Sequence, residues 1–319
     1  MRKLTDVHVH LAALPTPENG CRISPRLLRG PVGSLVARRL GLPLDQPEQA
    51  NLLYLERLRA ELLGSARVGR AVLLGLDGVY DESGRLDEAR TDLLVANDFV
   101  LKSAATAPSL FLAGVSVNPR RRDALDELER CAAAGAVLVK VLANSQGFDP
   151  ALPRFRPFYK ALARLKLPLL AHVGFEFSLL GHDQSVGDLA RLVPALEEGA
   201  TVIAAHGAST GLLFIERHWA LLRELAGRFP NFYADVSALT LFNRVGQLLR
   251  IRRHPELFGR LLFGTDYPLP VYSYPCLLAG RGRAWAAARA AASRFDRQVL
   301  VLEALGVGFE KDFADLQGG

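Results

Sequence analysis

The feature that most constrains this chain is a rhythm along its 319 residues, in which a short apolar run is followed by a polar loop and a longer amphipathic stretch. Runs that are apolar throughout are typical of parallel strands with both faces covered. Strands that alternate with helices form βαβ units, and eight such units favour a closed barrel over an open sheet. We therefore predict an α/β protein with a (β/α)8 TIM barrel. The eight runs span residues 4–9, 70–76, 110–117, 136–142, 167–173, 201–206, 231–236 and 261–266.

The amphipathic stretches between these runs predict the outer helices. The segment 123–134 has acidic residues near its start and ends at Gly135, a frequent helix stop. The segments 155–165, 185–198 and 212–228 show similar periodicity. Each of these stretches predicts one helix on the outside of the barrel.

Two regions exceed a minimal barrel. Residues 12–50 are rich in proline and have too little apolar periodicity for a core of their own, so we predict an insertion that lies over the barrel mouth. Residues 281–319 follow the last strand and predict a helical extension that packs on the outside. The whole chain, residues 1–319, is thus predicted to form a single barrel domain with these two additions.

Composition limits the classes of function. Hydrophobic residues make up 50% of the chain and charged residues 23%, which is typical of a globular protein. No apolar run approaches the roughly 20 residues that cross a bilayer, and the start of the chain lacks a signal-peptide core, so we expect a cytoplasmic protein without a membrane partner. The three cysteines are too scattered for a disulfide framework. The net charge of +6 comes from arginines spread along the chain, and we expect no nucleic-acid partner.

Histidines gather where the predicted strands end. Side chains at the carboxyl ends of barrel strands converge on one site. His8 and His10 end the first run, and strand periodicity places both imidazoles on the same face. His172 and His206 end the fifth and sixth runs, and Asp266 ends the eighth. The chain has seven histidines, and independent placement would rarely put four of them at strand ends.

Buried imidazoles and a buried carboxylate in one pocket need a compensating partner, because desolvating polar groups costs free energy. A divalent cation is such a partner. Imidazole and carboxylate ligands suit zinc, iron or manganese, and three histidines with one aspartate leave a position open for water. An open position is typical of a catalytic metal rather than a structural one. We predict one or two divalent ions, with zinc as the first choice.

The order of these strand ends resembles the motif series of the amidohydrolase superfamily. The connecting stretch, with GVSVNP at 114–119, QGFDP at 146–150 and FYADVS at 232–237, most resembles the amidohydrolase-related (amidohydrolase 2) branch of that superfamily. This branch includes decarboxylases that act on carboxylated unsaturated acids. The resemblance covers residues 4–270 and implies a metal-dependent barrel enzyme. The matching segments are DVHVH at 6–10, LVKVL at 138–142, LLAHVG at 169–174, VIAAHG at 202–207 and LLFGTDYP at 261–268.

This resemblance implies a role for each strand-end residue. His8, His10 and His172 would bind the more buried metal together with Asp266. Because a metal lowers the pKa of its bound water to about 7, Asp266 would take a proton from that water and carry it to the leaving group. His206 would polarise the substrate in a site with one metal and would be a ligand in a site with two.

Lys140 ends the fourth run, where an unpaired ammonium is costly. Family members with two metals carry a carbamylated lysine at this position, which bridges the ions. The alternatives are a cation that binds a substrate carboxylate and an ion pair with a barrel carboxylate such as Asp235. The residues alone leave all three open.

Loops after barrel strands commonly determine specificity. We therefore expect substrate contacts from Asn144, Gln146, Arg154 and Tyr267. Arg154 is suited to clamp an anionic group, and a solvated surface arginine is the alternative for it.

The leading hypothesis is a metal-dependent hydrolase that uses a metal-activated water to cleave a C–N or C–O bond in an amide, imide, lactone or ester. The second is a metal-dependent non-oxidative decarboxylase of an unsaturated or aromatic acid, and the third is a non-catalytic metal-binding barrel. Residue spacing does not separate the first two, since a fold does not decide chemistry. A small molecule, carboxylated or not, is the expected substrate, and the arginine-rich helices are compatible with a homodimer.

Overall fold

The computed structural model describes residues 2–317 and contains an eight-stranded parallel sheet whose strands follow chain order. Backbone hydrogen bonds from Val7 N to Phe263 O (3.0 Å) and from Asp266 N to His8 O (2.9 Å) join the last strand region to the first. The sheet is therefore a nearly closed barrel, and the predicted fold class is confirmed. Its strands are β1 (Leu4–His10), β3 (Val68–Leu74), β5 (Phe111–Val115), β6 (Ala136–Val141), β7 (Leu169–Ala171), β8 (Val202–Ala204), β9 (Phe232–Asp235) and β10 (Leu261–Leu262).

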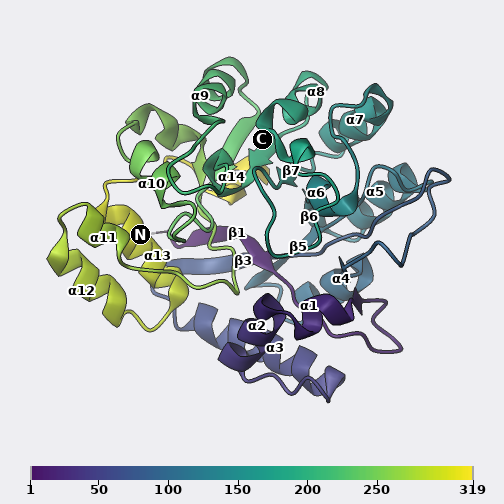
Figure 1. Cartoon of the computed structure of the whole chain (residues 1–319), viewed down its shortest axis with the longest axis horizontal. Coiled ribbons are helices and arrows are strands. Elements are labelled where there is room, and N and C mark those ends of the chain that lie inside the picture. The colour runs from purple at the N-terminus through teal and green to yellow at the C-terminus, as the bar shows by residue number, and fades with distance from the viewer. Residues whose placement is uncertain (1, 318–319) are drawn as a thin grey trace.

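Helices surround this barrel, and Figure 1 shows α1, α2 and α3 together on one side of it, in purple, with α11, α12 and α13 next to one another in yellow-green. The helices are α1 (Pro25–Arg29), α2 (Pro31–Leu40), α3 (Pro47–Leu63), α4 (Asn97–Ala105), α5 (Ala124–Ala133), α6 (Ala143–Gln146), α7 (Arg156–Arg164), α8 (Val193–Glu197), α9 (Trp219–Arg228), α10 (Val245–Ile251), α11 (Pro275–Leu278), α12 (Gly282–Ala290), α13 (Arg294–Ala304) and α14 (Phe313–Gln317).

Two outer helices are shorter than predicted. In the segment 185–198 only α8 is α-helical, and the residues before it form two 3-10 turns. In the segment 212–228 the helix starts only at α9, because a loop replaces the first turns. That loop is held by the Glu216 carboxylate, which accepts from the Thr210 backbone N at 2.7 Å, and Leu213 adopts a left-handed conformation with φ of 58°.

Three of the six prolines in the segment 12–50 begin helices instead of marking loops. Pro25, Pro31 and Pro47 stand in the first turns of α1, α2 and α3, where a missing backbone N–H leaves no helix hydrogen bond unmade. A short antiparallel pair, β2 (Arg22–Ile23) with β4 (Leu93–Leu94), ties the segment to the connection after β3.

The end of the chain differs from the prediction of an extension that packs only on the outside. Asp312 accepts hydrogen bonds from Thr5 N (2.7 Å) and Thr5 Oγ1 (2.9 Å), which places α14 beside the start of β1. Its Phe313 is buried in the core inside the barrel, so α14 closes the end opposite the carboxyl ends of the strands. The residues of that inner core are Val7, Val72, Leu74, Leu138, Leu170, Ile203, Ala205, Tyr233, Leu262 and Phe313.

Candidate metal centre

Three of the predicted ligands meet at the carboxyl end of the barrel. One donor atom each from His8, His10 and Asp266 lies within 4.8 Å of the other two. Asp266 Oδ1 is 3.0 Å from His10 Nε2 and 3.5 Å from His8 Nε2. His8 is fully buried, whereas 32% of the His10 side chain is exposed. The three donor atoms therefore surround a point that is closed on the barrel side and open beside His10.

Two site residues have left-handed backbone conformations, which side chains other than glycine adopt infrequently. Asp266 has φ of 64° and His206 has φ of 58°. Hydrogen bonds to the barrel fix both, because Asp266 N donates to His8 O (2.9 Å) and His206 N donates to Asp235 Oδ1 (2.8 Å). Such conformations persist where surrounding contacts hold them, often at functional sites.

A buried carboxylate orients the imidazole of His8. Asp235 Oδ2 is 2.7 Å from His8 Nδ1, and Ser237 Oγ is 3.0 Å from the same atom. With Nδ1 engaged in this way, His8 Nε2 is the nitrogen that faces Asp266. Although Asp235 also falls in a group with His8 and His206 that could hold a metal, its contacts fit a carboxylate that orients a metal-binding histidine.

His172 and His206 lie against each other at the same end of the barrel. His172 Nδ1 is 3.3 Å from His206 Nε2, and the ring centroids are 5.1 Å apart. His172 Nε2 is buried and, within residues 2–317, has no hydrogen-bond partner; Glu176 Oε2 is 3.7 Å away. His172 does not belong to the group of His8, His10 and Asp266, so its predicted role as a ligand stays a prediction.

The protonation states of these groups suit metal binding. Burial lowers the pKa of His8, and it lowers the pKa of His172 and of His206 well below the usual value, so the three imidazoles are neutral at pH 7. Burial by itself would raise the pKa of Asp266, but the neighbouring imidazoles of His8 and His10 hold it well below its usual range. Neutral imidazoles beside an ionised carboxylate are a donor set for zinc and similar ions.

These observations fit a divalent ion. The orphaned, buried Nε2 of His172 is a polar atom that needs a partner, and the donor atoms of His8, His10 and Asp266 are close enough to share one ion. His206, the buried neighbour of His172, lies 4.0 Å from Asp266 through its Nδ1.

Lys140 lies on β6 with its side chain fully buried in the same cluster. Its Nζ is 3.3 Å from His8 Nε2, whereas the carboxylate of Asp235 is hydrogen-bonded to His8. The ion pair of Lys140 with a barrel carboxylate such as Asp235 stays a prediction. Burial lowers the pKa of Lys140 to about 8, and the carboxylates of Asp235 and Asp266 oppose that shift. A bridging carbamate and a substrate-binding cation remain as alternatives.

A cavity of about 380 Å³ opens beside this cluster, within the size range of small-molecule sites. His10, Lys140, His172, His206 and Asp266 all line it. The opposite wall comes from the segment 12–50, from α3 and from the loop after β7. The cavity therefore connects the candidate ligands with the segment that the sequence places over the barrel mouth.

Asn144 and Gln146, two of the predicted substrate contacts, do not line this cavity. Both are buried and hold loops in place: Asn144 Nδ2 donates to Gln184 Oε1 (2.9 Å), and Gln146 Oε1 accepts from Leu142 N (2.7 Å). Their position directly after β6 is as predicted, but the turn of α6 directs both side chains into the protein.

Arg154 and Tyr267 also lie away from the cavity lining. Arg154 is half exposed, with its guanidinium 3.7 Å from the Glu82 carboxylate, so the solvated alternative describes it better. Tyr267 is buried beneath the guanidinium of Arg294, which lies 4.2 Å from the centre of its ring. We do not retain either residue as a substrate contact.

Two further charged residues, Arg244 and Glu176, line the cavity. Arg244 is buried and donates from Nη1 to Ser209 O at 3.0 Å. Glu176 is buried too, and its Oε1 accepts from the backbone N of Leu179 (2.9 Å) in the loop after β7. Both follow barrel strands, where active-site residues usually lie. The sequence does not distinguish Arg244 from a surface arginine, because arginines are common in loops between a strand and a helix.

The amidohydrolase family model (Amidohydro_2) matches residues 5–298 of the chain. The chain belongs to the amidohydrolase family. The match confirms the family that the strand-end motifs indicate. Members of this family include metal-dependent hydrolases and decarboxylases, and this amidohydrolase carries candidate metal-binding histidine and aspartate groups at the expected end of its barrel.

Solved structures with a similar fold cover nearly the whole of this amidohydrolase. An uncharacterized TIM-barrel protein, Bb4693 from Bordetella bronchiseptica, is 19% identical with a TM-score of 0.60, over 96% of this chain and 100% of that one. The apo form of Metarhizium anisopliae IDCase is 15% identical with a TM-score of 0.54, over 96% and 97%. A 2,6-dihydroxybenzoate decarboxylase is 18% identical with a TM-score of 0.51, over 96% and 100%. At these identities the likeness establishes the fold alone.

No curated protein matches the chain significantly. Among residues 2–317, no helix has both the length and the apolar character that a membrane span requires.

Proposed function

We propose that this amidohydrolase is a metal-dependent hydrolase that cleaves a C–N or C–O bond of a small amide, imide, lactone or ester. The observation that carries the proposal is the group of donor atoms from His8, His10 and Asp266, within 4.8 Å of one another at the inner end of the cavity. We further propose zinc as the ion and His172, with its orphaned Nε2, as the fourth ligand.

A divalent ion in this position would supply Lewis-acid polarisation and an activated water. Asp266 is ionised and lines the cavity, so its carboxylate is able to accept a proton from water and return it to the leaving group. His206, which lies beside His172 on the cavity wall, would hold a substrate oxygen. The cationic groups of Lys140 and Arg244 would stabilise negative charge that develops on that oxygen.

A non-oxidative decarboxylation is the second candidate, favoured by one observation. Arg244 and Lys140 both line the cavity and carry positive charge, which suits the binding of a substrate carboxylate. In that reaction Asp266 would take a proton from water and pass it to the substrate carbon, as that carbon loses carbon dioxide. The difference between the two reactions lies in the product and is directly measurable.

Metal analysis and a substrate panel test the proposal together. Protein purified without chelator should contain about one equivalent of zinc or a similar ion, and esters, lactones and amides should be hydrolysed only by the metal-loaded protein. Release of carbon dioxide from aromatic or unsaturated acids, without hydrolysis of the other compounds, would establish the decarboxylase instead. Bound metal with neither reaction over the panel would support the non-catalytic barrel, and protein that binds no metal would exclude all three.

The number of bound ions indicates whether Lys140 is unmodified or carbamylated. A single ion predicts an unmodified ammonium, whereas two equivalents with extra electron density on Nζ would show a bridging carbamate. We propose the single ion and an unmodified Lys140, whose Nζ lies 3.3 Å from His8 Nε2.

A further inference from the structure

The side chains that the segment 12–50 contributes to the cavity before α3 are aliphatic. The segment 12–50 lines the cavity with branched chains from α1, α2 and the connections around them, and its helices lie together on one side of the barrel (Figure 1). Burying each methylene of a ligand against such a wall is favourable by the hydrophobic effect. The principal contributors are Leu14, Ile23, Leu27, Leu28, Val36 and Leu42.

The polar residues of α3 on this wall direct their polar atoms into the protein. Asn51 Oδ1 accepts from Leu14 N (2.7 Å), and Asn51 Nδ2 donates to Leu14 O (2.9 Å). Tyr54 Oη donates to His10 O at 2.5 Å. Because these groups are already satisfied, α3 offers a ligand mainly the hydrocarbon parts of the two side chains.

Charged and ionisable groups lie at the other end of the cavity. Lys140, His172, His206, Arg244 and Asp266 all belong to the barrel end, and all five line the same space. The cavity is therefore polarised, with a charged inner end and an aliphatic outer wall. A molecule that fills it needs a polar head and an apolar body.

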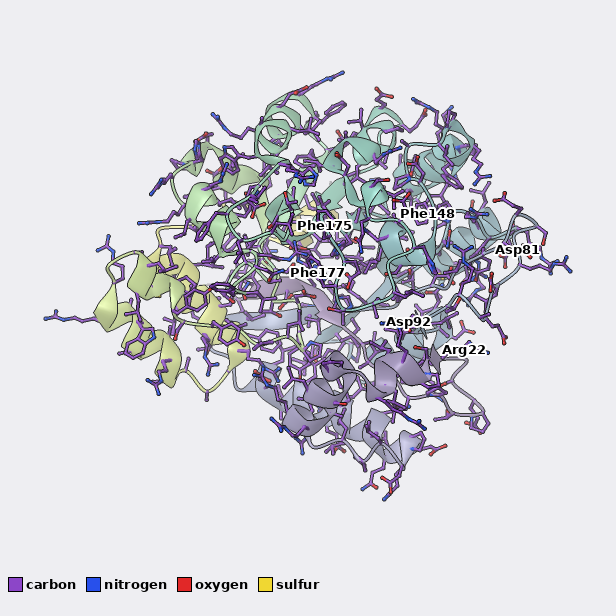
Figure 2. The ribbon with its side chains drawn as sticks, viewed as in Figure 1. Arg22, Asp81, Asp92, Phe148, Phe175 and Phe177 are labelled. Atoms are coloured by element: carbon purple, nitrogen blue, oxygen red, sulfur yellow. The ribbon has the colours of Figure 1, made fainter. Side chains whose placement is uncertain are left out.

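Aromatic stacking partners are few along this space. Phe175 and Phe177, on the loop after β7, stack on each other with ring centroids 6.0 Å apart and an angle of 13° between the planes. Figure 2 labels both near the middle of the molecule, above the purple helices of the segment 12–50. The wall opposite them is branched aliphatic, which packs against a flexible chain as readily as against a flat ring and gives the ring no stacking face.

We propose that the substrate of this amidohydrolase carries an aliphatic chain that lies against the segment 12–50, with its carbonyl or carboxylate head directed at Arg244 and Lys140. The inference deepens the proposed function and depends on it only for the reaction of the head group. The inference of an aliphatic chain in the substrate is based on the residues that line the cavity.

Binding of linear saturated carboxylates tests this inference without any catalytic step. Butanoate, hexanoate, octanoate and decanoate, with benzoate as the flat comparator, are titrated calorimetrically into metal-loaded protein below their micelle concentrations. Affinity should rise about two- to fourfold per added methylene until the chain fills the cavity, and octanoate should bind more tightly than benzoate. An affinity that is independent of chain length, or tighter binding of benzoate, overturns the inference.

A matched pair of variants on α2 tests whether the aliphatic chain of the ligand lies against this helix. Val36 lines the cavity, whereas the neighbouring Leu35 is 39% exposed and outside its lining. Val36→Trp should lower the affinity for octanoate and decanoate at least tenfold and should change the affinity for butanoate by less than twofold. Leu35→Trp should leave the affinity for every carboxylate of the series unchanged. Equal effects of both variants, with circular dichroism showing both to be folded, contradict the assigned wall.

The two proposals can fail separately. Chain-length-dependent binding with no hydrolysis of any ester, lactone, imide or amide would overturn the proposed hydrolase and would still support the aliphatic site. Hydrolysis of esters at rates and affinities that do not depend on the length of the acyl chain would support the proposed hydrolase and overturn the proposed aliphatic site.

Discussion

His8 is the residue on which most contacts of the site converge. Its Nδ1 is held by Asp235 and Ser237, its Nε2 faces Asp266, and Lys140 lies against the same nitrogen. When a carboxylate holds one nitrogen of a histidine, the other nitrogen points in a single direction and binds a metal more tightly. Two predictions follow at this scale, one for the ligand and one for its carboxylate partner.

His8→Ala should abolish most metal binding, because it removes a central donor atom. His254→Ala is the matched control, since His254 pairs with Glu256 at the surface, with Nδ1 and Oε1 2.8 Å apart. Elemental analysis of both purified proteins measures the effect, with circular dichroism to check folding. Full metal occupancy in folded His8→Ala protein would show that the ligand assignment is wrong.

Asp235→Asn should weaken metal binding by about 10–100-fold, because the amide no longer fixes His8 as a charged carboxylate does. Asp188→Asn changes a 52% exposed aspartate that lies 3.8 Å from another histidine, His218, and should leave metal affinity unchanged. Competition with a chromogenic chelator gives both affinities. Equal affinities for the two variants would assign Asp235 a purely structural role.

At the scale of elements, one buried carboxylate joins the outer wall of the cavity to the barrel. Asp92 accepts hydrogen bonds from Ser24 Oγ and the Arg26 guanidinium, at the start of α1, and from Leu180 N (3.0 Å) in the loop after β7. In Figure 2 Asp92 lies close to Arg22, at the edge of the purple helices. Asp92 therefore connects the segment 12–50 with the loop after β7, and both of these line the cavity.

Asp92→Ala should loosen the segment 12–50, because the bonds it loses are together worth roughly 1–3 kcal/mol. Amide hydrogen exchange in that segment should speed up several-fold while exchange in the barrel strands stays unchanged. Asp81→Ala is the control, since its carboxylate bonds only to Ser83 and Arg85 in its own loop. If Asp92→Ala left exchange in the segment unaltered, other contacts would have to hold it.

At the scale of the whole molecule, an ion pair joins helices that are far apart in sequence. Arg294 at the start of α13 donates to both carboxylate oxygens of Glu61 on α3, with an Nη2–Oε2 distance of 2.7 Å. It also donates to Pro268 O (2.9 Å) in the loop after β10. Both charged side chains are largely covered, at 19% and 17% exposure. The pair thus ties the extension and α3 to the end of the barrel.

Arg294→Ala should lower the free energy of unfolding by about 2 kcal/mol, somewhat less than the loss from a fully buried pair. Tm should fall by several degrees in a thermal scan. Arg223→Ala, which breaks the exposed pair with Glu256 (3.3 Å), should change Tm by less than a degree. A Tm for Arg294→Ala equal to that of the control would mean that the pair contributes little to stability.

The sequence by itself determined the barrel and the position of its site. The βα rhythm is a local property, so eight strands and their order follow from periodicity, and parallel closure brings their carboxyl ends together. For that reason His8 and His10 lie in one group of donor atoms with Asp266, which is more than 250 residues further along the chain, where the sequence placed it.

Only the tertiary structure decided which loop residues reach the cavity. Asn144, Gln146 and Tyr267 follow strands as active-site residues do, yet turns and packing bury their side chains in the protein, while Arg244 is directed at the site. The same holds for the segment 12–50, whose aliphatic side chains form a wall only once its helices pack beside the cavity. The paths of loops depend on contacts between distant residues, and no local pattern in the sequence carries that information.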